Sequence, residues 1–333
     1  MRIAILGAGL SGLVLAEQLQ DCAELVLFDK SHGVGGRMAT RRADDFAFDH
    51  GAQFFTARSK AFRRFLLPLV ETGVIAQWEP RVLTLAAGEK PYKRDWFEPH
   101  YVAVPGMTAL CKALAEPHVL QLECCVTGIT PVEHAGIRKW QLMTSAGPAG
   151  EPFDWVLSTL PAPKMQMLFE DHLHTFPFDV QQSLAEVVLS PCFALMLGFA
   201  APLSLSFDAA RIKHPVLDWV SVNNSKPGRS ASTALVLHSS ASWARENTHN
   251  EKDWVAEQML AAFQSVLPAT LPAPQLQVLH RWMYASVEQP LEHSSVLQTG
   301  VRLGFCGDWC TGSSVEAAFT SAMHLAAQLK TQL

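Results

Sequence analysis

Short apolar runs and a segment with helical periodicity alternate at the start of the chain. Residues 3–6 and 25–28 are uninterrupted apolar runs of strand length, and residues 13–19 between them repeat apolar positions at helical spacing. A strand, a helix and a second strand in this order are typical of a βαβ unit with a parallel sheet. The pattern therefore predicts an α/β fold that begins within the first few residues.

The turn between the first strand and the helix reads Gly-Ala-Gly-Leu-Ser-Gly and contains Gly7, Gly9 and Gly12. In such a turn the first glycine permits the tight bend, the second lets the backbone approach a pyrophosphate, and the third lets helix and strand pack closely. The N–H groups at the start of the helix attract the phosphates. We therefore expect a bound dinucleotide, which also contacts Leu10 and Ser11.

Residues after the second strand indicate which dinucleotide is bound. Asp29 follows the glycines by about 20 residues, where a carboxylate meets the ribose hydroxyls, and Lys30 lies next to it. FAD and NAD share these signals. The segment Gly-Val-Gly-Gly-Arg-Met comes next, and its Gly36, Arg37 and Met38 add a second close backbone approach and a guanidinium suited to phosphate. The two glycine segments together favour FAD.

A matching signal lies near the other end of the chain. Residues 301–306 are predicted as a strand that runs into Gly307 and Asp308, and a helix follows. Ser313 and Glu316 have the spacing of a capping box, which predicts Ser313 as the N-cap. We expect Asp308 to accept hydrogen bonds from the ribityl hydroxyls of a flavin, and the helix N-terminus to face the ring. Further cofactor contacts are expected from Ser314, Val315 and Ala318.

The middle of the chain alternates between predicted helices and strands. The expected elements are a helix at 60–72, short strands and turns at 75–104, a helix at 108–115, and strands at 120–127, 153–161 and 193–199. Residues 187–207 have the length of a transmembrane span, but Pro191, Gly198 and Pro202 interrupt them, so we predict a buried strand there and no membrane segment. From residue 162 to residue 289 we expect an antiparallel sheet with covering helices.

Composition and charge narrow the function classes. The formal net charge of −5 gives no electrostatic reason to expect nucleic acid or an anionic membrane surface as a partner. The seven cysteines have neither CxxC nor Cys/His zinc spacing, so we expect no disulfide framework and no metal site. We expect Cys306 and Cys310 to be buried thiols rather than a redox pair. The sequence leaves the oligomeric state open.

The glycine motif at 7–12, Asp29, the segment at 33–38 and Gly307-Asp308 before a helix together resemble the flavin-containing amine oxidase superfamily. Within it, shorter segments resemble the renalase family, at residues 49–55, 102–107, 237–240, 281–282, 286–287 and 320–322. The resemblance extends over essentially the whole chain, and its two terminal motifs are the more specific ones.

This resemblance implies a two-domain α/β fold of the amine oxidase/hydroxybenzoate hydroxylase-like kind. A Rossmann-like FAD-binding domain would comprise residues 1–74, 105–161 and 290–333, and a second, antiparallel-sheet substrate domain would comprise residues 75–104 and 162–289. The catalytic cleft is expected between the two domains. In the superfamily the strand predicted at 120–127 lies beside the adenine, which adds Val126 to the expected cofactor contacts.

The resemblance also implies an activity. Renalases bind FAD without a covalent link and oxidise isomeric 2- or 6-dihydroNAD(P) to NAD(P)+ by hydride transfer to flavin N5, and O2 is reduced to H2O2. This is a repair of NAD(P) metabolites in the cytoplasm. Two alternatives stay open, namely a small-amine oxidase of the flavin monoamine oxidase type and a non-catalytic flavin-binding protein. The preferred isomer and the choice between NAD and NADP also stay open.

The substrate site requires flat groups that can hold a ring near the flavin. Trp282 and Tyr284 lie two residues apart, on one face of a presumed strand, and His238 ends an apolar strand. The candidates for catalytic roles are Trp282, Tyr284, His238 and Gln53, and Gln53 is also expected at the cofactor.

Charged residues bear on the choice between the two substrates. A dinucleotide requires cations for its pyrophosphate, and Arg211, Lys213, Lys226 and Arg229 are predicted to cluster in the substrate domain for this purpose. An amine oxidase often has a lysine beside the flavin, and no lysine is placed convincingly for that role. The charges therefore favour the dinucleotide.

Overall fold

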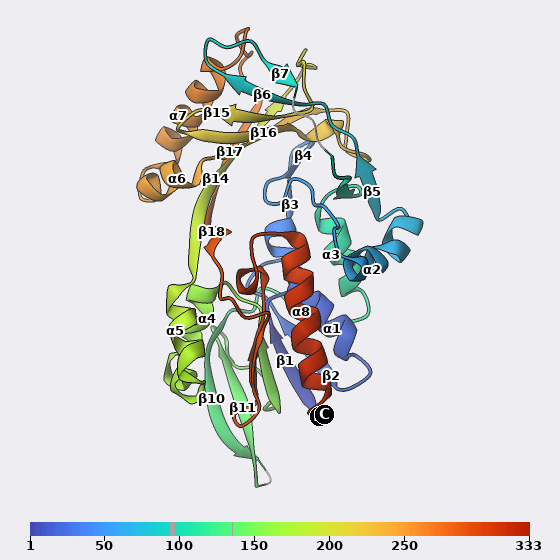
Figure 1. Cartoon of the computed structure of the whole chain (residues 1–333), viewed down its shortest axis with the longest axis vertical. Helices are drawn as coiled ribbons and strands as arrows, with labels where there is room; N and C mark the ends of the chain where they lie inside the picture. The colour runs from blue at the N-terminus through green and yellow to red at the C-terminus, as the bar shows by residue number, and fades with distance from the viewer. Residues whose placement is uncertain (94–96, 135) are drawn as a thin grey trace. The chain divides into compact units, whose positions relative to one another are not determined.

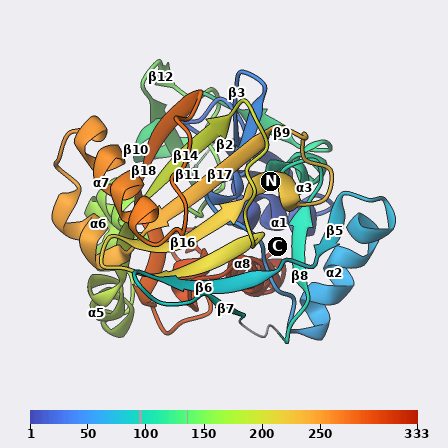
Figure 2. The same ribbon diagram turned by 90° about the horizontal axis from the view of Figure 1, so that it is seen from above.

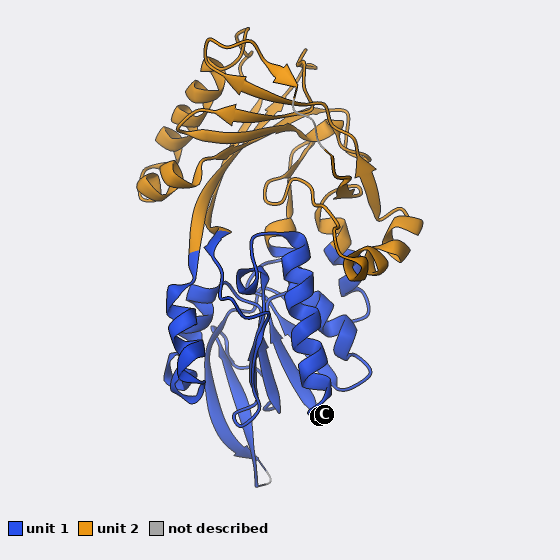
Figure 3. Cartoon of the chain, in the orientation of Figure 1, with its two compact units in different colours: residues 1–36, 111–188, 287–333 blue, residues 37–110, 189–286 orange. Residues whose placement is uncertain are grey.

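The structure is a computed structural model and describes residues 1–93, 97–134 and 136–333. Residues 94–96 belong to the stretch predicted as short strands and turns, and they lie outside the described residues. Figure 3 shows two compact units. Unit 1 comprises residues 1–36, 111–188 and 287–333, and unit 2 comprises residues 37–110 and 189–286.

The limits of the compact units differ from the functional domain boundaries expected from the sequence. Residues 37–74 and 105–110 belong to unit 2, and residues 162–188 and 287–289 belong to unit 1. Compact units follow the density of packing, whereas the expected domains were defined by the ligand that each would bind. The division into FAD-binding and substrate domains therefore stays a prediction.

Unit 1 is built on a six-stranded sheet with the order β19-β20-β13-β1-β2-β9. Figure 1 shows β1 and β2, which pair in this sheet. All neighbouring strands are parallel except β19 and β20. The bounds are Arg2–Leu6 for β1, Glu24–Phe28 for β2, Val119–Gln121 for β9, Trp155–Ser158 for β13, Val296–Gln298 for β19 and Leu303–Phe305 for β20. The parallel βαβ unit predicted at the start of the chain is confirmed.

Helices α1 (Leu10–Leu19) and α8 (Val315–Lys330) lie side by side in unit 1, as Figure 1 shows. Ser11 Oγ donates a hydrogen bond to the carbonyl of Ala318 over 2.9 Å, so the N-terminal turns of the two helices are tied together. The other elements of unit 1 are β10 (Val126–His134), β11 (Ile137–Thr144), β12 (Gly147–Pro148), α4 (Ala162–Leu168), η2 (Glu170–Thr175), α5 (Phe178–Glu186) and η4 (Asp308–Cys310).

Two strand predictions in unit 1 were partly wrong. The strand expected at 120–127 is divided between β9 and β10, because the N–H groups of Glu123 and Cys124 bond to the carbonyls of Ser31 and Asp29 instead of to a strand. The strand expected from residue 301 starts at Leu303, because Arg302 has a φ of 59° and closes a turn. Left-handed backbone of this kind does not continue a strand.

The cap predicted for the last helix was also wrong by one residue. α8 begins at Val315, and Ser314 rather than Ser313 is its N-cap, with the side chain accepting a hydrogen bond from the Ala317 N–H over 2.9 Å. A capping residue requires extended backbone, which Ser314 has with a φ of −156° and a ψ of 162°.

Unit 2 contains a seven-stranded sheet with the order β18-β14-β17-β16-β15-β6-β7, and Figure 2 shows β14, β17 and β16 side by side. The bounds are Val82–Ala86 for β6, Tyr92–Lys93 for β7, Val188–Phe199 for β14, Ala209–Lys213 for β15, Leu217–Val222 for β16, Thr233–Ser239 for β17 and Leu276–Gln289 for β18. The paired strands described by register are antiparallel except β15 and β6, which are parallel. The predicted antiparallel sheet and the buried strand at 193–199 are therefore confirmed, apart from that one pair.

The two faces of this sheet have different coverings. On β17, Leu235 and Leu237 pack into a core that includes Met259 and Phe263 of α7 (Lys252–Ser265). Val236 points to the opposite face. There it packs with Met196 of β14 and with Phe46 and Phe48 of β4 (Phe46–Asp49).

Unit 2 also contains smaller elements. They are η1 (Gly36–Met38, shared with the end of unit 1), β3 (Thr40–Ala43), α2 (Lys60–Glu71), β5 (Ile75–Trp78), β8 (His100–Ala103), α3 (Thr108–Ala115, which continues into unit 1), η3 (Asn223–Ser225) and α6 (Ala241–Asn247). The helices predicted at 60–72 and 108–115 are confirmed, with Thr72 as the C-cap of α2. Among the described residues, no helix is long and apolar enough to cross a bilayer.

Candidate functional site

The glycine turn of unit 1 has the geometry that close contact with a phosphate requires. Gly7 has a φ of 107°, which L-residues rarely adopt. A Cβ on Gly12 would lie 1.9 Å from the Gly7 carbonyl oxygen, so the helix and the turn could not pack around a larger residue. A Cβ on Gly9, in contrast, would meet nothing within 4 Å. The open space beside Gly9, at the start of α1, fits a phosphate group.

The second glycine segment lies against the first one. The N–H of Gly35 donates to the Ala8 carbonyl over 2.9 Å, and a Cβ on Gly36 would lie 3.6 Å from Gly9 Cα. Both Gly35 and Gly36 have positive φ values, 116° and 52°. Two stretches of glycine backbone therefore border the same space, as the sequence predicts for a dinucleotide.

Asp29 connects β2 to this glycine turn. Its Oδ2 accepts from the Ala8 N–H and its Oδ1 from the Ser31 N–H, each over 2.8 Å, and the side chain is half-buried. Each carboxylate oxygen has a second lone pair. Asp29 can therefore accept hydrogen bonds from ribose hydroxyls while it holds the turn in place.

The remaining cofactor candidates of unit 1 lie in four places. Asp308 is buried and accepts the Trp309 N–H at Oδ1 over 2.9 Å, and the Gly307 N–H donates to Ser321 Oγ over 3.0 Å. Val315 and Ala318 are half-buried in the first turn of α8, which Ser314 caps. Lys30 is exposed, and Val126 is the half-buried first residue of β10.

Three residues expected to contact the cofactor lie in unit 2 instead. Arg37 Nη1 lies 3.5 Å from the Ala285 carbonyl, at hydrogen-bond limit, and Met38 is buried. Gln53 is buried as well, and its contacts are described below.

A buried carboxylate organises a group of polar side chains in unit 2. Asp49, at the end of β4, is fully buried, and its Oδ2 lies 3.2 Å from Lys226 Nζ and 2.7 Å from Arg229 Nη2. The two cationic side chains are 0% and 1% exposed. Asp49 Oδ1 accepts from Thr40 Oγ1 over 2.7 Å and from the Met107 N–H over 2.9 Å. One carboxylate thus joins four separate segments of unit 2.

These buried charges shift one another's pKa values. Burial alone would raise the pKa of Asp49, but the positive charges of Lys226 and Arg229 outweigh it and lower the pKa to about 2. Burial lowers the pKa of Lys226 to about 8; the positive charge of Arg229 adds to this effect, and Asp49 opposes it. Near neutral pH all three groups are charged, and the network carries one net positive charge.

Gln53 has all of its amide atoms engaged by this network. Its Oε1 accepts from Ser221 Oγ over 2.5 Å and from Lys226 Nζ over 3.2 Å. Its Nε2 donates to the carbonyl of Asp49 and, over 3.3 Å, to that of Gly51. Gln53 was expected to contact substrate and cofactor, and its position in the structure instead suits holding the chain after Asp49.

Aromatic side chains gather at the next residue, His50. The His50 ring stacks on Trp282 at 5.0 Å between centroids and meets His280 edge-on at 4.8 Å. The His50 carbonyl oxygen lies 3.0 Å from Trp282 Nε1 and 3.1 Å from His238 Nε2. We call these four residues, His50, His238, His280 and Trp282, the histidine–tryptophan cluster.

Alternation along the strands explains why these side chains meet. On β17, His238 has the parity of Val236, which faces β4. On β18, His280 and Trp282 have the parity of Val278, which packs against the same β4 residues. Tyr284 has this parity too and is half-buried. The structure therefore brings His238, Gln53 and Trp282 together and places Tyr284 on the same face of β18 as Trp282.

The imidazoles of the cluster are uncharged near neutral pH. Burial lowers the pKa of His50 and of His238 to about 4, and nearby positive charge adds to the effect for both. For His280, burial is again the largest cause, and the pKa is lowered. At this position the site can offer hydrogen bonds and flat ring surfaces, but no imidazolium.

One expectation about the charged residues was wrong. Arg211 and Lys213 are exposed on β15, whereas Lys226 and Arg229 are buried on Asp49, so the four cations do not cluster for a pyrophosphate. Sequence reasoning also missed the roles of Asp49, His50 and His280. The two-residue spacing of His280, Trp282 and Tyr284 could have revealed His280. No signal near Asp49 in the sequence indicates that it pairs with Lys226 and Arg229, which lie 177 and 180 positions further along.

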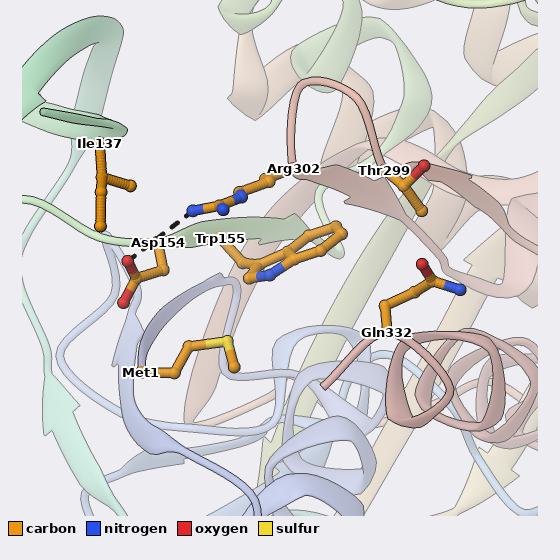
Figure 4. A pocket seen from close by; sticks show the side chains of 7 residues that line it. All are labelled: Met1, Ile137, Asp154, Trp155, Thr299, Arg302 and Gln332. Carbon is orange, nitrogen blue, oxygen red and sulfur yellow. Dashed lines mark ion pairs between the residues drawn. The ribbon is translucent and has the colours of Figure 1, made fainter.

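Other features of the described residues do not form a site. The cavity in Figure 4, of about 450 Å³, lies at the amino ends of β1, β13 and β20, and is lined by Met1, Ile137, Asp154, Trp155, Thr299, Arg302 and Gln332. Ligands of open α/β sheets bind at the carboxyl ends of the strands, where the glycine turns are. Among the described residues, no three His, Cys, Asp or Glu side chains are grouped to hold a metal ion.

The chain matches two protein families. Residues 5–67 match the NAD(P)-binding Rossmann-like domain, and residues 83–330 match the flavin containing amine oxidoreductase family. Because the second match spans most of its length, the chain belongs to the flavin containing amine oxidoreductases. It is an FAD-dependent oxidoreductase that acts on a small-molecule substrate.

Individual relatives refine this assignment. The chain is 25% identical to renalase of Mus musculus over 99% of this chain and 98% of that protein. It is 42% identical to a 4,4'-diapophytoene desaturase of Staphylococcus aureus, but over only 15% of this chain and 10% of the desaturase. The chain is thus renalase-like within its family.

Solved structures share the fold. A proposed protoporphyrinogen oxidase from Exiguobacterium sp. 255-15 has a TM-score of 0.80 at 15% identity, with 100% of this chain and 99% of that chain covered. Wild-type putrescine oxidase bound to putrescine has a TM-score of 0.73 at 13% identity, with 99% of each chain covered. The Rossmann-like and antiparallel-sheet architecture expected from the sequence is therefore confirmed.

Substitution of Gly9 tests the space beside the glycine turn. We expect Gly9→Val to fold, at a cost of about 1 kcal/mol for a poor N-cap residue, and to be purified without FAD, because the new side chain fills the space for a phosphate. Flavin absorbance per protein and denaturant unfolding of the apoprotein measure the two effects. Gly300→Ala is the control, since its Cβ meets only Gln298 Oε1, at 3.7 Å. A yellow Gly9→Val protein would exclude this role.

Removal of the buried carboxylate should be strongly destabilising. We expect Asp49→Asn to lower the free energy of unfolding by about 3–5 kcal/mol, because it leaves two buried cations without their counter-charge. The matched control is Glu98→Gln, which breaks the ion pair with Arg58 between side chains that are 43% and 72% exposed, at a cost of about 0–1 kcal/mol. Urea unfolding near neutral pH compares them, and equal costs would contradict the account.

The neutral imidazoles predict a pH dependence of stability. Between pH 6.5 and about 4, His50 and His238 are protonated in the unfolded chain but not in the folded protein. The free energy of unfolding should therefore fall as the pH is lowered through this window. Each histidine contributes a slope of at most about 1.4 kcal/mol per pH unit. In His238→Gln the slope should be smaller by one such contribution. An unchanged slope would show that His238 is protonated in the folded protein.

Proposed function

We propose that this chain oxidises 2- or 6-dihydronicotinamide dinucleotides to NAD(P)+ and reduces O2 to H2O2. The dihydropyridine ring loses a hydride, and O2 takes up its two electrons together with that proton and one proton from water. The observation that carries this proposal is the flat, neutral character of the histidine–tryptophan cluster: His50 stacks on Trp282, the imidazoles are neutral, and Lys226 and Arg229 are paired with Asp49. Renalase similarity over 99% of the chain supports it.

The chemistry of a dihydropyridine matches such a surface. Loss of hydride gives an aromatic pyridinium directly, so the reaction needs no general base. What the protein must supply is a flat, weakly polar surface that orients the ring. Trp282 is suited to this, because a hydrogen bond to the His50 carbonyl and stacking on the His50 ring fix its orientation. Aromatic faces also tolerate the positive charge that develops on the ring.

FAD, when bound, supplies the two-electron acceptor that takes the hydride and later passes the electrons to O2. We propose that Gly9 and the start of α1 hold its pyrophosphate, Asp29 its adenosine ribose and Asp308 its ribityl chain. The link is proposed to be non-covalent. Burial raises the pKa of the Cys310 thiol to about 12, so this cysteine has no thiolate to attack the ring.

Amine oxidation is the second candidate, favoured by the family name and by the structural likeness to putrescine oxidase. An amine must be neutral before it can give up a hydride, which usually calls for a group that accepts its proton. Lys226 donates to Asp49, Gln53 and Asn223 over 3.0–3.2 Å, so all three of its protons are in use. This arrangement favours the dinucleotide.

Aerobic turnover distinguishes the two substrates. The purified holoprotein is incubated with 2-dihydroNAD, with 6-dihydroNAD, with ordinary 4-dihydroNAD and with a panel of primary amines including putrescine. We expect O2 uptake with stoichiometric H2O2 and NAD+ from one or both of the wrong isomers, and none from the 4-isomer or the amines. Aldehyde and ammonia from an amine would overturn the proposal in favour of an amine oxidase.

A further inference from the structure

The tautomer of His238 is fixed by its neighbours. His238 Nε2 lies 3.1 Å from the His50 carbonyl oxygen, which can only accept a hydrogen bond. Nε2 must therefore carry the proton, and in the neutral ring Nδ1 is then an acceptor.

The orientation of Gln53 supports the same assignment. Lys226 Nζ can only donate, so the oxygen of Gln53 must face it and the Gln53 amide nitrogen must face the carbonyls of Asp49 and Gly51. The Gln53 nitrogen also lies 3.4 Å from His238 Nε2. Since both nitrogens are donors, this contact offers Nε2 no competing acceptor. The proton therefore stays on His238 Nε2, which donates it to the His50 carbonyl oxygen.

The other nitrogen of His238 is available. Among the described residues no hydrogen-bond partner lies at His238 Nδ1, the side chain is half-buried, and Nδ1 is not one of the fully buried atoms that lack a partner. His238 Nε2 and Trp282 Nε1 both donate to the His50 carbonyl oxygen, so the two side chains are held at the same residue. The cluster thus combines a flat ring with one fixed, neutral acceptor.

We infer that His238 Nδ1 accepts a hydrogen bond from the substrate's carboxamide NH2 group, so that the site selects nicotinamide over nicotinic acid dinucleotides, and that Lys226 is a positioning residue for this acceptor. This inference rests on the proposed function. A carboxylate in place of the carboxamide has no proton to donate, and it would set two acceptors against each other. A site built to pair with an N–H group discriminates strongly against an analogue that lacks one.

Lys226 contributes in two ways. It orients Gln53, and its positive charge opposes protonation of His238, which would convert Nδ1 into a donor. Burial is the larger cause of the lowered His238 pKa, and hydrogen bonding to the His50 carbonyl opposes it. The other titratable or charged groups around the cluster are His50, His280, Arg41 and Lys252. The residues paired with His238 on the neighbouring strands are Ala194 and Trp219, which do not titrate.

The test compares the amide and the acid on variants that separate the two ring nitrogens. Wild type should oxidise the isomeric dihydro form of NAD with a kcat/KM at least about 10-fold above that of the same dihydro form of nicotinic acid adenine dinucleotide. His238→Gln keeps a donor near the Nε2 position and loses the Nδ1 acceptor, so the preference should fall below about 3-fold, through a loss on the amide alone. His238→Asn places an amide oxygen near Nδ1 and should retain part of the preference.

The outcomes separate the two proposals. Equal rates on the amide and the acid, or an equal loss on both in His238→Gln, would overturn the inference while the oxidase activity stands. Oxidation of neither dinucleotide would overturn the proposed function and this inference with it.

A pH profile tests Lys226 separately. Lys226→Met leaves Asp49 paired with Arg229, so the variant should fold. With the positive charge removed, the pKa of His238 should rise, and the acid limb of the kcat/KM profile should move to higher pH. A merely structural role would lower the plateau without moving this limb, and an unmoved limb would contradict the assignment of Lys226.

Discussion

The arrangement of unit 2 depends on how one buried carboxylate is satisfied. Asp49 accepts hydrogen bonds from β3, from the loop before α3 and from two cations of the segment after β16. A buried charge is tolerated only when it is paired and hydrogen-bonded, so these segments must converge on it. Since Gln53 and His50 follow Asp49 directly in the chain, the same constraint fixes the residues that meet His238 and Trp282. The hydrogen bonds and ion pairs of Asp49 therefore position the residues of the candidate substrate site.

The surroundings of the cluster also determine its charge. Burial keeps the imidazoles of the cluster neutral, and for His238 the positive charge of Lys226 adds to this effect. A neutral histidine whose proton is committed to a carbonyl is a fixed acceptor, and a fixed acceptor can select one face or one substituent of a flat substrate. Hydride donation by a dihydropyridine requires this kind of orientation rather than acid–base chemistry. The geometry of unit 2 and the renalase-like sequence thus favour the same substrate class.

Local signals in the sequence predicted much of the fold and of the expected cofactor region. Gly7 and Gly12 adopt the strained and the tightly packed positions that their spacing indicates, and Asp29 reaches the glycine turn, because these features depend on neighbours within one βαβ unit. Features set by distant partners were not predictable. Asp49 and Lys226 are 177 positions apart in the chain. Because of this pairing, Lys226 is the buried counter-charge of Asp49 rather than the pyrophosphate-binding cation that the sequence had suggested. Small backbone choices, such as the left-handed Arg302, also shifted element boundaries.

The central claim is that this flavoenzyme takes a hydride from a misreduced nicotinamide ring, and anaerobic mixing tests it most directly. The oxidised holoprotein is mixed without O2 with 2- or 6-dihydroNAD, and separately with amines, while the visible absorbance of the flavin is followed in a stopped-flow instrument. The account predicts rapid bleaching by at least one of the two isomers and no bleaching by amines. Bleaching by amines alone, or by none of these donors, would contradict it.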